Sequence, residues 1–256
     1  MTSKRVIDLW IPYRKPSSRA RLRLFCFPFA GGSASIFLNW YKMFPSEIEI
    51  CPIQYPGREK RINESGFRSL KPLVTTLADI LLPELDIPFA FFGHSMGALI
   101  SFELACRLQK KDISPICLFL SSYCAPTIPK KETPIHLLPD REFLEKLHEY
   151  NGTPALVLQN DELMNLLLPA LRADFAIHET YVHSPSNPLN CPISVFGGLE
   201  DPDVKYNDLE LWKEQTTNSF SLQMFPGDHF YIRTSPEYVV NTILKQLQSN
   251  KNWLYG

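Results

Sequence analysis

The feature that most constrains this chain is a serine flanked by glycines, at the point where a buried apolar run gives way to a helical one. Residues 93–97 read Gly-His-Ser-Met-Gly. Before them, 89–92 is a short continuous apolar run, typical of a strand that is buried on both faces. After them, 98–108 has helical composition. A sharp turn from strand to helix needs small neighbours and exposes the serine hydroxyl, so we predict that Ser95 is a nucleophile on such a turn. An ordinary glycine-rich turn is the alternative.

Strand-like and helix-like segments alternate along most of the chain. Beside the run before Ser95, the sequence predicts strands at residues 22–27, 47–55, 116–120, 193–196 and 221–225. A helix-like run at 36–44 follows the first strand, and 70–85 has apolar residues along one helical face. This order predicts a mostly parallel central sheet flanked by helices. Together with the serine turn it predicts the α/β-hydrolase fold, as a single domain over residues 1–256.

The pattern changes between the strands at 116–120 and 193–196. Prolines are frequent at its start, and 142–150 and 161–179 are predicted to be helices. No strand of comparable strength is expected between them. We interpret residues 126–183 as a helical cap, or lid, inserted over the carboxyl edge of the sheet, where folds of this kind bind ligands.

A serine needs a base to remove its proton, and in this fold a histidine should come last in the order serine, acid, histidine. His229 lies on a loop between the last predicted strand and the final helix, so we predict that it is the base. His94 is expected to point away from the neighbouring serine. The four other histidines fall in the cap or its exit, where solvated or core-capping roles are expected; they are His136, His148, His178 and His183.

The acid that orients the histidine should follow an intermediate strand. The loop after 193–196 offers Glu200, Asp201 and Asp203, and Asp228 stands beside the histidine itself. We prefer Asp201, because two glycines turn the chain out of the strand just before it and Pro202 restrains it. Glu200 and Asp203 are expected to be solvated, and Asp228 is too close in sequence to reach the back of the imidazole.

An oxyanion in such a site is stabilised by two backbone N–H groups. One normally comes from the residue after the nucleophile, here Met96. The other comes from the loop after an early strand, here the glycine-rich turn at 29–32. No Gly-Lys-Ser or Gly-Lys-Thr follows that turn, which excludes a P-loop.

Composition excludes several classes of partner. The formal net charge is −1, from 26 basic and 27 acidic side chains, so no nucleic acid is expected as a partner. There is no signal-peptide pattern and no apolar run long enough to span a membrane, so we expect a cytoplasmic protein without membrane contact. The six cysteines are scattered and read as buried thiols, without disulfides or a metal site. We expect a monomer.

Five ordered motifs resemble those of one known family. Residues 24–35 read LFCFPFAGGSAS, 55–59 read YPGRE, 93–98 read GHSMGA, 171–175 read LRADF and 227–230 read GDHF. Together they resemble the type II thioesterases that accompany nonribosomal peptide and polyketide synthases, from about residue 21 to about residue 247. That family is related to the animal thioesterase that releases medium-chain fatty acids.

The resemblance implies hydrolysis of acyl or aminoacyl thioesters on the phosphopantetheine arm of carrier proteins, with editing of the synthase as the role. It implies no cofactor or metal of the enzyme's own, because the substrate carries the phosphopantetheine. By position, Ser95, Asp201 and His229 match the catalytic triad of the family. Ala30 and Met96 match its oxyanion donors, and the cap matches its mobile lid.

Basic residues near the expected site are candidates for contact with an acidic carrier protein. They lie at 58–61, which contains Arg58, Lys60 and Arg61, and at Lys130 and Lys131 in the cap. The interpretation that we favour is a solvated surface loop, because surface charge clusters are common.

Other functions use the same residues. A medium-chain fatty acyl thioesterase or a general carboxylesterase would need the same triad. An inactive hydrolase fold that serves as a binding module is disfavoured, because every part of the catalytic machinery is present.

Overall fold

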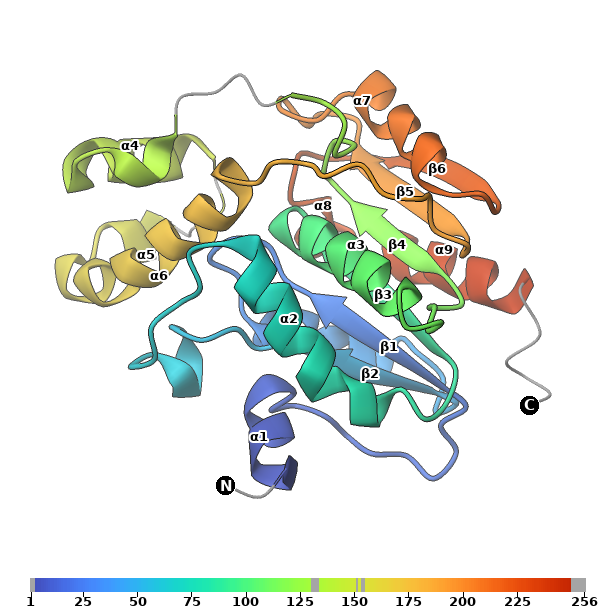
Figure 1. Ribbon diagram of the computed structural model, residues 1–256. Helices are drawn as coiled ribbons and strands as arrows, with labels where there is room; N and C mark the ends of the chain where they lie inside the picture. The colour runs from blue at the N-terminus through green and yellow to red at the C-terminus, as the bar shows by residue number, and fades with distance from the viewer. Residues whose placement is uncertain (1–2, 130–133, 151, 153–154, 250–256) are drawn as a thin grey trace.

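The computed structural model describes residues 3–129, 134–150, 152 and 155–249. Its centre is a six-stranded sheet in the order β2-β1-β3-β4-β5-β6, and every neighbouring pair is parallel (Figure 1). The parallel sheet flanked by helices confirms the predicted fold class. Within the described residues, no helix combines the length and apolar composition that crossing a membrane requires.

The strands are β1 (Leu22–Phe27), β2 (Ile48–Pro52), β3 (Phe89–His94), β4 (Leu118–Ser121), β5 (Ile193–Gly198) and β6 (Phe220–Phe225). The α-helices are α1 (Ser3–Trp10), α2 (Leu70–Leu81), α3 (Met96–Gln109), α4 (Asp140–Glu149), α5 (Ala155–Leu158), α6 (Asp161–Glu179), α7 (Tyr206–Glu210), α8 (Tyr231–Thr234) and α9 (Pro236–Ser249). The 3-10 helices are η1 (Ala34–Lys42), η2 (Glu59–Arg61), η3 (Leu82–Glu84), η4 (Ile135–Leu137) and η5 (Leu211–Gln215).

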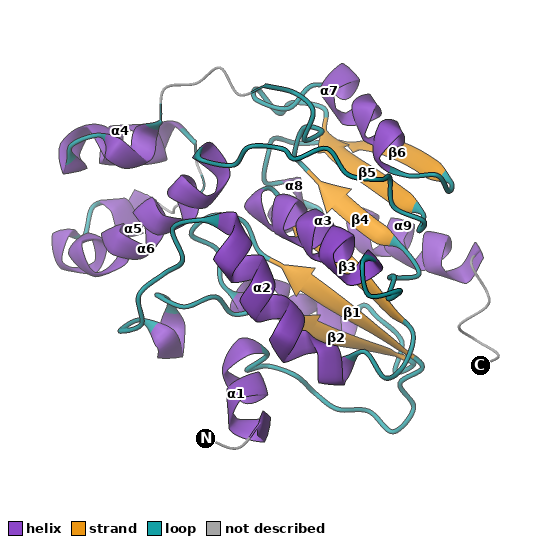
Figure 2. Cartoon of the chain, in the orientation of Figure 1, coloured by secondary structure: helices purple, strands orange, loops and turns teal. Residues whose placement is uncertain are grey.

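Alternating strand side chains build a core on each face of the sheet. In β1, Phe25 and Phe27 belong to the core shared with α2 and α3, whereas Leu24 and Cys26 belong to the core shared with η1 and α9. Figure 2 shows helices on both faces of the strands. Because the central strands are buried on both sides, their carboxyl ends are fixed in position, and the loops that leave these ends are held there too.

The segment predicted to be the cap forms η4, α4, α5 and α6, which lie beyond the carboxyl ends of the strands (Figure 1). It has a small core of its own, made by Ile135, Phe143, Leu147, Met164, Leu168, Leu171 and Phe175. The boundaries at 126 and 183, and the extent of the single domain, remain predictions.

The structure differs from the sequence-based prediction at the start of the chain and after β1. The helix expected at 36–44 is the 3-10 helix η1, at 34–42. Helix α1 was not predicted. It ends in Trp10, which is buried and lies under the guanidinium of Arg61 at 4.4 Å from the ring centroid.

Candidate active site

Ser95 stands between β3 and α3, on a strained turn. Its backbone has φ 53° and ψ −120°, a left-handed conformation that side-chain-bearing residues rarely adopt. Its N–H donates to the carbonyl oxygen of Ser121 in β4 at 2.7 Å, which ties the turn to the neighbouring strand. Ser95 is half-buried and directly follows the last residue of β3, so it lies at the carboxyl edge of the sheet.

The glycines on either side of Ser95 are required by close packing. A Cβ at Gly93 would lie 2.2 Å from the carbonyl oxygen of Gly97, and a Cβ at Gly97 would lie 2.1 Å from that of Phe27. Both distances are far inside van der Waals contact with backbone atoms that have no room to move. Only glycine fits at these two positions, because the chain turns tightly from β3 into α3 and passes close to β1.

His229 and Asp201 meet at this edge from the loops after β6 and β5. Nδ1 of His229 lies 2.7 Å from Oδ2 of Asp201. The Asp201 side chain is fully buried, and its other oxygen accepts the backbone N–H groups of Asp203 at 2.9 Å and Val204 at 3.1 Å. The histidine is thus held by a carboxylate that is itself fixed, which leaves Nε2 for the serine side of the site.

The electrostatics of Asp201 suit a carboxylate that stays ionised. Burial by itself would raise its pKa. The hydrogen bond with His229, the positive charge that this ring can carry, and the amides of Asp203 and Val204 act the other way, and the net effect is a pKa below the usual value. Asp201 can therefore stabilise an imidazolium on His229 without taking the proton.

The other carboxylates that the sequence offered lie apart from the imidazole. Glu200 and Asp203 are exposed. Asp228 accepts the N–H of Phe230 at 2.8 Å and so shapes its own loop. The geometry therefore brings Asp201, and not its neighbours, to His229.

Two backbone N–H groups stand ready as anion donors. Met96 is the first residue of α3, so its N–H has no acceptor inside the helix. In the turn after β1, Gly31 donates to Asp174 at 2.7 Å and Gly32 donates to the carbonyl of Phe29 at 2.8 Å. Ala30 lies between Phe29 and Gly31, and its N–H has no hydrogen-bond partner among the described residues. The predicted donors thus have the free N–H groups that the role requires.

A family model described as thioesterase domain matches residues 22–247. The gramicidin S biosynthesis protein GrsT of Aneurinibacillus migulanus is 47% identical over 249 residues, which cover 97% of this chain and 97% of that protein.

The chain belongs to the thioesterase family.

Solved structures refine this assignment. The thioesterase is similar to the type II thioesterase BorB from the borrelidin biosynthetic cluster, with a TM-score of 0.86, 34% identity, and coverage of 94% of this chain and 98% of BorB. It is also similar to YbtT, a type II thioesterase from the yersiniabactin NRPS/PKS pathway, with a TM-score of 0.83, 28% identity, and coverage of 92% of this chain and 97% of YbtT. These findings confirm the resemblance to type II thioesterases and the assignment as a serine hydrolase.

One polar network in the thioesterase was not anticipated from sequence. Nδ1 of His94 lies 2.7 Å from the Ser121 hydroxyl, which lies 2.5 Å from the hydroxyl of Tyr231. The His94 ring is fully buried, 5.4 Å from the His229 ring between centroids. Burial, with smaller contributions from the positive charges of His229 and Arg233, lowers the pKa of His94 well below 6.5. A neutral histidine therefore lies behind the one that we predict to be the base.

The proposal that Arg58 lies on a solvated or partner-binding loop was wrong. Arg58 and Arg61 are only 5% and 6% exposed. Arg58 forms a bidentate ion pair with Asp174 of α6, with both N···O distances 2.8 Å. Asp174 lies in the LRADF motif, which the sequence analysis singled out, but nothing in that motif indicated an ion pair with Arg58. Lys60 is exposed, and Lys130 and Lys131 lie outside the described residues.

The cap contacts the thioesterase body close to the histidine loop. A Cβ at Gly152 would lie 3.0 Å from the Phe230 ring, and the Gly152 carbonyl accepts from Arg233 at 3.3 Å. Phe230 also packs edge-on against Phe29 in the turn after β1, with centroids 4.9 Å apart. An apolar wall next to His229 is thus built from the cap, the body and the turn.

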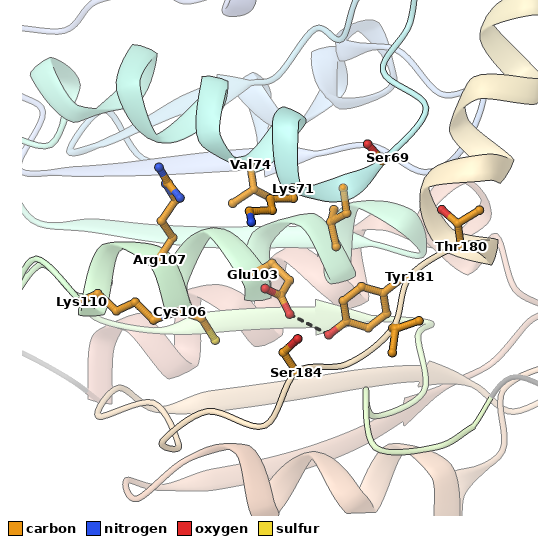
Figure 3. Close-up of a pocket in the computed structure, with 12 residues that line it drawn as sticks. Ser69, Lys71, Val74, Glu103, Cys106, Arg107, Lys110, Thr180, Tyr181 and Ser184 are labelled. Carbon is orange, nitrogen blue, oxygen red and sulfur yellow. Dashed lines mark hydrogen bonds between the residues drawn. The ribbon is translucent and has the colours of Figure 1, made fainter.

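Two surface hollows of the thioesterase lie apart from the triad. A groove of about 420 Å³ runs between α2 and α3 and is closed by the segment after α6 (Figure 3). In it Tyr181 donates to Glu103 at 2.6 Å, and Lys71, Arg107 and Lys110 lie around it. A second hollow, of about 500 Å³, lies on the other side of Tyr181, against the loop after β4. Neither is lined by Ser95, Asp201 or His229.

Proposed function

We propose that this thioesterase hydrolyses acyl and aminoacyl thioesters from the phosphopantetheine arm of carrier proteins, and so clears stalled or mis-primed synthase modules. The observation that supports the chemistry is the buried Asp201 carboxylate, 2.7 Å from Nδ1 of His229, at the same sheet edge as the strained Ser95 turn. The substrate class rests on membership among the type II thioesterases.

In the first half-reaction, Ser95 Oγ attacks the thioester carbonyl carbon while Nε2 of His229 takes the hydroxyl proton. The carbonyl π electrons move onto oxygen, where the N–H groups of Ala30 and Met96 stabilise the charge. When the tetrahedral intermediate collapses, the C–S bond breaks and the imidazolium returns its proton to the pantetheine sulfur. Asp201 stabilises the imidazolium throughout. The product is an acyl ester on Ser95.

In the second half-reaction a water molecule takes the place of the thiol. His229 removes a proton from water as its oxygen attacks the acyl ester, and the same two amides hold the new oxyanion. Collapse breaks the C–O bond to Ser95, whose oxygen recovers the proton from the imidazolium. The carboxylic acid leaves and the enzyme is restored. Every step uses the chain's own side chains, backbone amides and water.

The preference for carrier-bound substrate must come from outside the triad, because triad chemistry is indifferent to the carrier. A thioester at the end of a long flexible arm has to pass the cap to reach Ser95, and contacts with the carrier add binding energy remote from the chemistry. Such energy lowers the barrier if it positions the thioester against the nucleophile and the donors. We therefore expect a higher kcat/KM for carrier-bound acyl groups than for the same groups on free pantetheine.

The test compares one acyl group on three leaving groups: a carrier protein, free pantetheine and a matched oxygen ester. We expect kcat/KM to be highest for the carrier. Lys60→Ala, and Lys130→Ala with Lys131→Ala, probe the basic residues that remain candidates for docking, and Ser95→Ala is the blank. Equal kcat/KM for all three substrates would favour a general carboxylesterase. A marked preference for medium-chain acyl groups, irrespective of the carrier, would favour a fatty acyl thioesterase, and no hydrolysis of any substrate would favour a binding module.

We also propose that the enzyme acts as a monomer in the cytoplasm. Light scattering of the purified protein, alone and with an acylated carrier, measures the mass of each species. A mass of one chain alone and of one chain plus one carrier together supports this arrangement, whereas a stable dimer contradicts it.

A further inference from the structure

The carboxylate of Asp174 joins the cap helix α6 to the turn that carries Ala30. Its Oδ2 accepts the N–H of Gly31 at 2.7 Å and Nη1 of Arg58 at 2.8 Å, and its Oδ1 accepts Nη2 of Arg58 at 2.8 Å. Asp174 is 2% exposed and Arg58 is 5% exposed. A helix of the cap, a loop after β2 and the turn after β1 therefore meet at one buried ion pair.

Arg58 fixes the same turn from its other side. Its Nη1 donates to the carbonyl of Gly32 at 3.0 Å, and its Nε donates to the carbonyl of Pro56 at 3.2 Å. Gly31 has φ +77°, and a Cβ there would lie 2.6 Å from a methyl carbon of Leu171 in α6. The turn is thus pressed against α6 with an amide and a carbonyl both held by the ion pair.

These contacts decide which N–H groups of the turn face a substrate. The Gly31 N–H is committed to Asp174 and the Gly32 N–H to the Phe29 carbonyl, so neither is available to a substrate oxygen, whereas the N–H of the preceding residue, Ala30, has no acceptor among the described residues. The N–H of Ala30 belongs to the peptide plane that it shares with the Phe29 carbonyl, and the hydrogen bond from Gly32 holds that plane. The bond to Asp174 holds the next plane, between Ala30 and Gly31, so the backbone is fixed on both sides of the Ala30 Cα.

The charge of Arg58 is needed as much as its hydrogen bonds. Asp174 is hydrogen-bonded to Gly31, the residue next to the proposed donor Ala30. An unpaired carboxylate so close to the donor would repel the negative charge that develops on the substrate oxygen. The bidentate guanidinium neutralises Asp174 while leaving its geometry intact. An apolar pair of similar volume is often as stable as a buried ion pair, so stability alone gives little reason for this arrangement.

We propose that Asp174 and Arg58 are positioning residues for the oxyanion hole, and that through them the cap helix α6 holds the Ala30 amide in place for the transition state. The inference rests on the proposed role of Ser95 and Ala30. It adds that α6 is a fixed wall of the active site at Asp174, whatever the rest of the cap does.

The first experiment is Asp174→Asn, which keeps the size of the side chain and an oxygen for Gly31 but removes the charge that holds Arg58. Removing an oxyanion donor outright typically costs about 10²- to 10³-fold in kcat, so misplacing one should cost about 10- to 100-fold. KM should stay within about twofold. The measurement is kcat per active site, counted with a fluorophosphonate, on an acyl-pantetheine thioester.

A pair of inhibitors separates positioning from a merely structural role. An alkyl trifluoromethyl ketone forms a hemiketal with Ser95 and places an oxyanion in the hole, whereas the matching alkyl thioether, in which a CH2 group replaces the thioester carbonyl, binds without one. We expect Asp174→Asn to weaken the ketone by the same factor as kcat/KM and to leave the thioether Kd unchanged. A structural role would weaken both inhibitors together, or reduce only the count of active sites. Either result would overturn the inference.

The matched control is Glu179→Gln, a second carboxylate of α6. Glu179 accepts the N–H groups of Ile135 and His136, both at 3.1 Å, and has no contact with the oxyanion turn. The Glu179→Gln variant should leave the ratio of the ketone and thioether affinities at the wild-type value. A fall in that ratio equal to the fall in Asp174→Asn would show that any damage to α6 has the same effect.

A double variant keeps the test informative if single variants fold poorly. Arg58→Met with Asp174→Leu replaces the buried pair with apolar side chains of similar volume, which proteins often tolerate without loss of stability. We expect a folded protein in which kcat remains at least 10-fold low. Wild-type kcat in this variant would show that the pair is dispensable for positioning. If the wild-type protein does not react with the fluorophosphonate at Ser95, the proposed function fails instead, independently of this pair.

Discussion

The sheet edge and the cap are built on different principles. Ser95, Asp201 and His229 stand on the loops that leave β3, β5 and β6, three strands of one parallel sheet with a large core on each face. Among the residues that the structure describes, the cap has a core of seven buried apolar side chains. The sheet edge is held in place by extensive packing on both faces of the sheet. The cap has far less buried apolar surface and therefore resists local opening less.

The difference suggests a division of labour within the molecule. Chemistry requires atoms held within a fraction of an ångström, and the sheet edge can provide that. Selection of an acyl group and a carrier requires a surface that adjusts, which a lightly packed cap can provide. Helix α6 belongs to both regions: Phe175 packs in the cap core, Ile177 packs in the sheet core, and Asp174 accepts the N–H of Gly31 in the turn after β1.

The largest effect expected at the sheet edge is the loss of the nucleophile. Ser95→Ala should lower kcat by about 10⁶-fold, as loss of a triad nucleophile does elsewhere, and should abolish fluorophosphonate labelling. The variant should fold normally, because alanine fits the space of serine. Labelling is followed by mass spectrometry of the modified peptide. A modified peptide that persists in the variant and maps to another serine would contradict the assignment.

The second prediction tests the assignment of Asp201 as the acid that orients His229. Asp201→Asn should lower kcat by about 10⁴-fold, because the amide neither stabilises the imidazolium nor selects the same tautomer of His229. Glu200→Gln and Asp203→Asn are the matched controls on the same loop, and both should stay close to wild type. If Asp203→Asn were the severe variant, the acid would have been misassigned.

The sheet edge is the part that sequence reasoning describes well, for a physical reason. Parallel strands end at one edge, so residues just after three buried runs must come together even when they are far apart in the chain. That logic predicted the pairing of Asp201 with His229, now observed at 2.7 Å. It also predicted six strands and a parallel sheet, because buried strands read as continuous apolar runs.

What could not be predicted depends on contacts between helices and loops. Arg58 and Asp174 are 116 residues apart, and no periodicity relates a loop after β2 to a helix of the cap. Arg58 was placed among surface charges, because a run of basic residues is normally solvated. The role of His94 was missed for a related reason, since its partner Ser121 lies on a neighbouring strand whose register is visible only in three dimensions.

The third prediction compares equal truncations in the two regions. Phe119 in the sheet core and Phe143 in the cap core are both fully buried. Phe119→Ala should lower the free energy of unfolding by about 3–5 kcal/mol, the usual cost of such a cavity. Phe143→Ala should cost less globally, because the cap can open on its own. Urea unfolding measures the first effect, and limited proteolysis of the cap measures the second.

Kinetics sharpen the same comparison. If the cap selects substrate, Phe143→Ala should raise KM and broaden acyl-chain preference while kcat is retained. A cost in unfolding free energy equal to that of Phe119→Ala, without extra cleavage in the cap, would show that cap and sheet form one cooperative unit. The division of labour would then have to be abandoned.

The smallest predicted effect concerns His94, behind His229 in the rigid region. Its pKa in the folded protein is well below 6.5, chiefly because the ring is buried. As pH falls below about 6.5, the unfolded chain takes up a proton on this ring while the folded chain does not, so the folded state loses stability by up to about 1.4 kcal/mol per pH unit. His94→Gln removes that proton uptake. Its free energy of unfolding should therefore change less with pH than that of the wild type.

At pH 7.5 the His94→Gln variant should be the less stable protein, by about 1 kcal/mol, because it weakens the hydrogen bond to Ser121. As the pH falls towards 5 the wild type should lose stability relative to the variant, so the gap between the two proteins should close. Urea unfolding at several pH values measures both curves. Ser121→Ala is the control: it removes the same hydrogen bond but keeps the imidazole, so its curve should run parallel to the wild type. Parallel curves for all three proteins would mean that water or charge reaches His94 in the folded state, and that the sheet edge is less tightly closed than its packing indicates.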